Sequence, residues 1–149
     1  MAEGDETTPV QDLYAPRSIC FGCGPANTLG LQIKSRRHGD GLRTVFRPRL
    51  QHQALIDCHG NWTAAVALLD ARGAEELPST VTARFEVKLR RITPIGEDLS
   101  VTSRVRQLDV EAGRVEVSVT VTAGGRVTAE GEGLFVAVEA GHPAHHRWQ

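Results

Sequence analysis

Three polar side chains, Asp57, His59 and Asn61, interrupt the otherwise apolar stretch HQALIDCHGNWTAAVALLDARG, which runs from His52 to Gly73. Burying a carboxylate without a partner costs free energy, so an acid in such a stretch is normally either paired or functional. A carboxylate held in apolar surroundings can act as a general base or as a nucleophile. Asp57 is therefore the first candidate catalytic residue of this chain.

The spacing around Asp57 indicates which side chains would accompany it on a helix. Asp57 and Asn61 are four residues apart and share one helical face, while Gly60 and Ala64 are small enough to let a ligand or a second subunit approach that face. His59 projects about 200° away from Asp57, so we expect a packed histidine rather than a partner for the acid. Alternatively, Asp57 only caps a shortened helix and accepts hydrogen bonds from its first N–H groups.

The cysteines are the other residues that could carry chemistry. Cys20 and Cys23 form a CxxC pair, and Cys58 lies in the helical segment. Two thiols are half of the four ligands of a structural zinc site, and the histidines are scattered or near the end of the chain. We therefore expect structural thiols, with no bound metal and no organic cofactor. An odd number of cysteines also favours reduced thiols over a disulfide framework.

The length, charge and hydropathy of the chain predict one globular domain and a cytoplasmic location. The 149 residues include 17 Lys and Arg against 18 Asp and Glu, and the sequence pI is about 6.6. This balance argues against a nucleic-acid partner. No apolar run approaches the roughly 20 residues that span a bilayer, and the acidic, polar start is unlike a secretory signal. A membrane partner is therefore not expected.

Alternation of apolar and polar residues after the helical segment predicts long antiparallel strands. The alternation covers residues 81–89, 99–105 and 115–121 and resumes at Val127, with a change of phase near Gly131 and Gly133 that predicts a bulge. Before the helix, LGLQIKSRR and LRTVFRP flank a Gly-Asp-Gly turn and predict a hairpin. The polar ends, residues 1–17 and 140–149, predict a flexible leader and a flexible tail around a domain of residues 18–139.

These elements have one economical arrangement. A helix that is apolar on most sides belongs inside the molecule, and about six strands can wrap around it as one curved antiparallel sheet. This places the chain in the α+β class. The order of strand, strand, helix and then four strands resembles the hotdog fold.

Two stretches resemble one branch of the hotdog-fold thioesterase superfamily, of the phenylacetate-pathway thioesterase type. CFGCGPANTLGLQI, from Cys20 to Ile33, is similar to its Cys-Phe-x-Cys-Gly segment, and LIDCHGNWTAA, from Leu55 to Ala65, is similar to its Leu-Leu-Asp-Cys-His-Gly helix. The resemblance covers about residues 20–138. It implies hydrolysis of a small acyl or aryl thioester, linked to coenzyme A or to a carrier, with Asp57 as general base or nucleophile.

The resemblance also implies oxyanion donors from a Gly-rich turn that opens the helix. That turn is missing between FRPRLQHQ and ALID. His52 and Gln53 lie there instead and are candidates to bind the substrate carbonyl. Gly60 and Asn61 are the other candidate substrate-binding residues.

A second alignment would make Asp70 the carboxylate and His59 part of the opening turn. Eleven residues separate these two, which is close to three helical turns, so they lie too far apart to act on one carbonyl. We therefore prefer the alignment on Asp57.

Two other functions remain open at this level. A hydratase or isomerase acting on acyl thioesters uses the same fold, and a hotdog protein that has lost its oxyanion turn would bind an acyl or aromatic ligand without turnover. The sequence identifies neither the acyl group, nor the carrier, nor the pathway. An exposed edge strand in such a sheet predicts a homo-oligomer, either a dimer or a tetramer.

Overall fold

The computed structural model describes residues 6–47 and 54–145 of the chain. Its strands form one antiparallel sheet in the order β1-β2-β4-β5-β6-β3. The elements, in chain order, are α1 (Val10–Tyr14), β1 (Arg36–His38), β2 (Gly41–Phe46), α2 (Ala54–Arg72), β3 (Thr80–Leu89), β4 (Leu99–Asp109), β5 (Arg114–Ala123) and β6 (Arg126–Ala137). The predicted α+β hotdog fold is confirmed.

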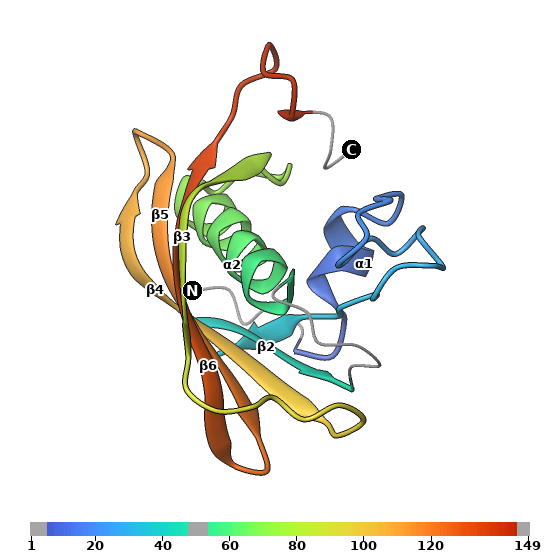
Figure 1. The fold of residues 1–149 in the computed structure, drawn as a ribbon. Coiled ribbons are helices and arrows are strands. Elements are labelled where there is room, and N and C mark those ends of the chain that lie inside the picture. Colours follow the sequence, from blue (N-terminus) through green and yellow to red (C-terminus); the bar gives the residue numbers. More distant parts are fainter. Residues whose placement is uncertain (1–5, 48–53, 146–149) are drawn as a thin grey trace.

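The long helix α2 packs on the concave face of the sheet, against β2 to β6. Figure 1 shows α2 between that face and the N-terminal segment that carries α1. Burial on two sides explains why α2 is apolar nearly all round. No helix in the described part of the chain is long and apolar enough to cross a membrane. Buried apolar side chains of α2 are Leu55, Ile56, Trp62, Ala64, Ala65, Val66, Leu68 and Leu69.

The strands after α2 follow the predicted alternation. In β5, the inward residues Val115, Val117, Val119 and Val121 are each at most 3% exposed, while the residues between them are only partly buried. One face of the sheet therefore forms the core with α2, and the other face is wetter.

The first hairpin is shorter than predicted. β1 spans only Arg36–His38, and residues 29–35 form no strand. Their backbone instead bonds to the loop of the CxxC pair, because Leu31 N donates to Phe21 O at 2.7 Å and Ile33 N donates to Gly22 O at 3.0 Å. The alternation in LGLQIK thus reflects pairing with a loop rather than with β2.

The bulge predicted near Gly131 and Gly133 is at neither glycine, since both pair in regular register with β5 and with β3. The register shifts in the pairing of β6 lie at Ala83 of β3 and at Thr128 of β6, and a third shift lies at Arg106 of β4. The glycines serve close packing instead. A Cβ at Gly131 would stand 2.4 Å from Ile56 Cγ2, and one at Gly133 would stand 2.6 Å from the ring of Phe135.

Both ends of the described chain contain ordered contacts. Residues 10–14, inside the leader predicted from the sequence, form α1 and bury Val10 and Gln11. Near the other end, Ser79 Oγ donates to His145 O at 2.7 Å, and Ala144 is buried. These segments extend the packed structure beyond residues 18–139.

Candidate functional site

Asp57 lies inside the first turn of α2 and is half-buried. Thr82 of β3 donates its hydroxyl to Asp57 Oδ1 at 2.8 Å. An N-cap residue precedes the first helical turn, so a carboxylate within that turn is not in the cap position. Asp57 is therefore held toward β3 by a side-chain partner.

Asn61 lies one turn further along α2, on the same face, as the spacing predicted. Its Oδ1 accepts from Thr80 Oγ1 at 2.7 Å, and its Nδ2 donates to Thr80 O at 3.4 Å. Thr80 and Thr82 belong to β3, which is the last strand at one edge of the sheet. The Asp57 and Asn61 face of the helix thus meets the sheet at its edge strand.

Gly60 faces the interior of the subunit. A Cβ at this position would stand 2.8 Å from Phe135 Cζ and 3.2 Å from Val119 Cγ2. Phe135 is fully buried. The aromatic ring therefore fills the space that the sequence suggested for a ligand, and Gly60 serves the packing of α2 on β6.

His59 is a packed histidine, as expected, and does not contact Asp57. Its Nε2 lies 3.1 Å from Leu42 O and its Nδ1 lies 2.9 Å from Ser35 Oγ. Because a carbonyl can only accept, Nε2 carries the proton and Nδ1 accepts from the serine hydroxyl. Burial lowers the pKa of His59 to about 4, so the ring is neutral at physiological pH.

Two further candidates, His52 and Gln53, lie outside the described residues. Asp70 is exposed and forms a two-bond ion pair with Arg37 of β1, at 2.7 and 2.9 Å. Trp62 is 1% exposed and belongs to the core. Neither Asp70 nor Trp62 is placed to act with Asp57.

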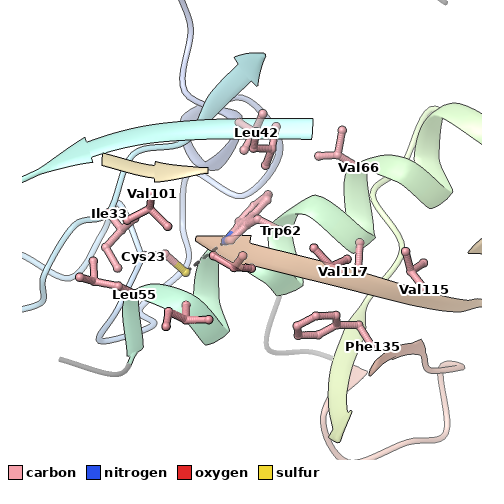
Figure 2. Packing of buried hydrophobic residues seen from close by; sticks show 14 of the residues in the cluster. Cys23, Ile33, Leu42, Leu55, Trp62, Val66, Val101, Val115, Val117 and Phe135 are labelled. Carbon is pink, nitrogen blue, oxygen red and sulfur yellow. Dashed lines mark hydrogen bonds between the residues drawn. The ribbon is translucent and has the colours of Figure 1, made fainter. Parts of the chain in front are cut away.

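The structure brings together three cysteines that the sequence left apart. The sulfurs of Cys20, Cys23 and Cys58 all lie within 4.8 Å of one another. Figure 2 shows one of them, Cys23, whose Sγ accepts a hydrogen bond from Trp62 Nε1 at 3.1 Å. The expectation that only the two thiols of the CxxC pair lie together was therefore wrong, because Cys58 near the start of α2 supplies a third thiol. The one signal in the sequence was that all the cysteines fall in the two stretches that carry the family resemblance.

The thiols influence one another's protonation. Hydrogen bonds from the side chains of Cys23 and Cys58 lower the pKa of Cys20, while the bond to Cys20 raises the pKa of both Cys23 and Cys58. Cys20 is exposed, Cys58 is half-buried and Cys23 is buried, so the cluster reaches solvent on the Cys20 side.

No protein-family model matches the sequence, and no curated protein matches it either. The fold has many solved relatives. A thioesterase superfamily protein from Shewanella loihica is 22% identical, with a TM-score of 0.59, and the match covers 77% of this chain and 98% of that one. A thioesterase from Thermus thermophilus, solved with coenzyme A and Zn, is 22% identical with a TM-score of 0.52, covering 72% and 91%.

A third solved relative is the PaaI protein of the Escherichia coli phenylacetic acid degradation operon. It is 12% identical with a TM-score of 0.59, and the match covers 73% of this chain and 81% of that chain. At these identities the likeness establishes the shared hotdog fold.

Proposed function

From the hotdog fold that this chain shares with thioesterase-superfamily structures, we propose that it hydrolyses a small acyl or aryl thioester, linked to coenzyme A or to a carrier. The observation that carries the proposal is Asp57, a half-buried carboxylate in the first turn of the central helix, oriented by Thr82. The T. thermophilus relative, solved with coenzyme A, supports a coenzyme A ester as the first substrate to test.

The chemistry needs a base or nucleophile and a group that binds the oxyanion. Asp57 would take a proton from a water that adds to the thioester carbonyl, or would itself add to that carbon. The carbon–sulfur bond then breaks, and the thiolate leaves with the electron pair and takes up a proton. In the route where Asp57 adds to the carbon, a water then hydrolyses the acyl–Asp57 anhydride and releases both the acid and Asp57. Backbone N–H groups at the start of α2 and the helix dipole would stabilise the negative oxygen.

Substrate binding in this proposal involves Asn61, whose side chain lies beside Asp57 on the face toward β3. His52 and Gln53 remain proposed binding residues in the segment before α2. The missing Gly-rich turn predicts slow turnover on generic acyl-coenzyme A esters, because one oxyanion donor is typically worth about 10² to 10³ in rate. A cytoplasmic location is part of the same proposal.

The test compares two isosteric changes on one helix. Asp57→Asn removes the base and should lower thiol release from a panel of acyl-coenzyme A esters by about 10² or more, with little change in melting temperature. Asp70→Asn is the matched control, because Asp70 is exposed and paired with Arg37 at the other end of α2. Its turnover should equal that of the parent.

Equal activity of Asp57→Asn and the parent would remove Asp57 from the mechanism. If the parent shows no thiol release, a rise in melting temperature with acyl-coenzyme A would identify a binding protein, since a ligand bound only by the folded state stabilises it. Loss of substrate without thiol release would instead identify a hydratase or isomerase.

A further inference from the structure

We propose that Cys20, Cys23 and Cys58 bind one Zn²⁺ ion as thiolates, with the fourth coordination position left to water or to a ligand from solution. This inference goes beyond the proposed thioesterase activity and does not depend on it.

The distances fit a tetrahedral site. Zinc binds cysteine sulfur at about 2.3 Å, so two sulfurs of one tetrahedron stand about 3.8 Å apart. The three sulfurs here lie within 4.8 Å of one another. Side-chain rotations that bring them closer by about 1 Å would complete the triangle of ligands.

The CxxC loop is shaped around the sulfurs. Gly24 N donates to Cys20 O at 2.9 Å, which closes the turn. A Cβ at Gly22 would stand 2.5 Å from Cys58 Sγ, so this glycine allows the loop to approach the helix.

The helix completes this arrangement from the other side. Trp62, one turn after Cys58, donates its indole N–H to Cys23 Sγ (Figure 2). Outer hydrogen bonds of this kind orient the ligands of metal sites and tune their charge. A disulfide would join only two of the three sulfurs and would leave the third thiol without a role.

The fourth ligand does not come from the neighbouring acid. Asp57 precedes Cys58 in sequence, but its carboxylate is held by Thr82 on the β3 side. Within residues 6–47 and 54–145, no histidine, aspartate or glutamate joins the three sulfurs as a ligand. Because Cys20 is exposed, the remaining position is accessible from solution.

The ion would connect two distant parts of the chain. Residues 18–33 contain no helix or strand, and Cys58 is the fifth residue of α2, directly after Asp57. Zinc would therefore fix this loop to the turn that carries Asp57. Chelation should lower the melting temperature, in contrast to the absence of any metal effect that the sequence alone predicted.

The experiment uses the full chain, reduced and kept free of oxygen. Titration with Zn²⁺ should saturate at one ion per chain, release protons as the thiols ligate, and protect the cysteines from a thiol reagent. Co²⁺ should give sulfur-to-metal absorption and the visible bands of a tetrahedral site, and Zn²⁺ should displace them. Three freely reactive thiols at saturating Zn²⁺, or a cysteine pair found as a disulfide in freshly purified protein, would overturn the proposal.

Variants locate the ion. Cys58→Ser should lose one-to-one binding, and Trp62→Phe should weaken it by roughly tenfold to a hundredfold by removing the bond to Cys23 Sγ. Asp57→Asn is the matched control, because its carboxylate faces away, and it should bind zinc as the parent does. Unchanged zinc binding by Cys58→Ser would contradict the site. If that variant does not fold, the cobalt spectrum of the parent decides.

Discussion

His59 has a chemical environment that predicts how the stability of the protein depends on pH. Gln11 Nε2 donates to Ser35 Oγ at 3.1 Å, that hydroxyl bonds to His59 Nδ1, and His59 Nε2 bonds to Leu42 O. Each polar atom in this buried series of hydrogen bonds has a partner, so the neutral imidazole ring of His59 is stable in its site. A proton added at Nδ1 would break the bond from Ser35 and would bury an unpaired charge.

We therefore expect stability to fall as the pH decreases from about 6.5 to about 4. Burial lowers the pKa of His59 from 6.5 to about 4, so in this range the unfolded chain takes up a proton that the folded chain does not. The loss for this one group is about 3 kcal/mol. Urea unfolding at several pH values measures it, and His59→Gln, which keeps a donor toward Leu42 O, should remove that part of the slope. An unchanged slope in His59→Gln would contradict the prediction.

The placement of some of these side chains could be predicted from the sequence, and the placement of others could not. The shared face of Asp57 and Asn61 and the packed state of His59 follow from helical spacing, which is local, and the structure confirms both. The meeting of Cys58 with Cys20 and Cys23 depends on how a loop without regular structure folds back on α2. No periodicity encodes that contact, so the sequence analysis missed the third thiol.

The packing of α2 on the sheet depends on glycines at the contact. Gly60 of α2 lies against Phe135 of β6, and Gly133 makes room for the same ring. Glycine weakens a helix by about 1 kcal/mol relative to alanine, so its presence in mid-helix needs a packing reason. The close approach to Phe135 supplies that reason.

Gly60→Ala should lower the free energy of unfolding by up to about 2 kcal/mol, because overpacking costs about 1 to 3 kcal/mol and the better helix propensity returns about 1. Urea unfolding would measure the change. Gly141→Ala is the control, since nothing lies within 4 Å of a Cβ there. Phe135→Leu should relieve the clash, so the double variant should be more stable than the sum of the single changes allows. A stabilising Gly60→Ala would refute this account of the contact.

Among the elements, the strands of β3 to β6 were predictable because their inward and outward residues alternate over long runs. α1 was not, since a five-residue helix carries too little periodicity to be recognised. The change in the alternation of apolar residues near Gly131 wrongly predicted a bulge at that glycine. Leu134 and Val136 are half-buried on the other face while Phe135 still points inward, so both faces of β6 carry apolar residues there.

The two edges of the sheet differ, and the difference bears on assembly. β1 contributes a short edge of three residues, whereas β3 contributes ten, and β3 pairs with β6 on one side and with no strand of the described chain on the other. Exposed apolar residues, Leu89 and Ile92, lie at and just beyond the end of β3. A long exposed edge invites pairing with a second copy. We propose that β3 pairs antiparallel with β3 of an identical subunit.

The charges on β3 favour one register for that pairing. In an antiparallel pair centred on Phe85, Arg84 of one subunit lies opposite Glu86 of the other, and two-fold symmetry repeats the pair. Both side chains are exposed, and each also contacts an opposite charge within its own subunit, Arg84 with Glu116 at 3.4 Å and Glu86 with Lys88 at 3.5 Å. The same edge carries Thr80 and Thr82, which hold Asn61 and Asp57, so the second subunit would stand next to the proposed catalytic carboxylate.

Light scattering should therefore give a mass of at least twice the 16.2 kDa of one chain. Glu86→Arg would turn both cross-strand pairs into like-charge pairs and should weaken the dimer by roughly twofold to thirtyfold, since two pairs of about 0.2 to 1 kcal/mol each are lost. Arg84→Glu combined with Glu86→Arg restores opposite charges and should restore the dimer. Sedimentation at several protein concentrations measures all three proteins. A monomeric parent at micromolar concentration would reject the assembly, and a double variant as weak as Glu86→Arg would reject the register while leaving edge pairing in place.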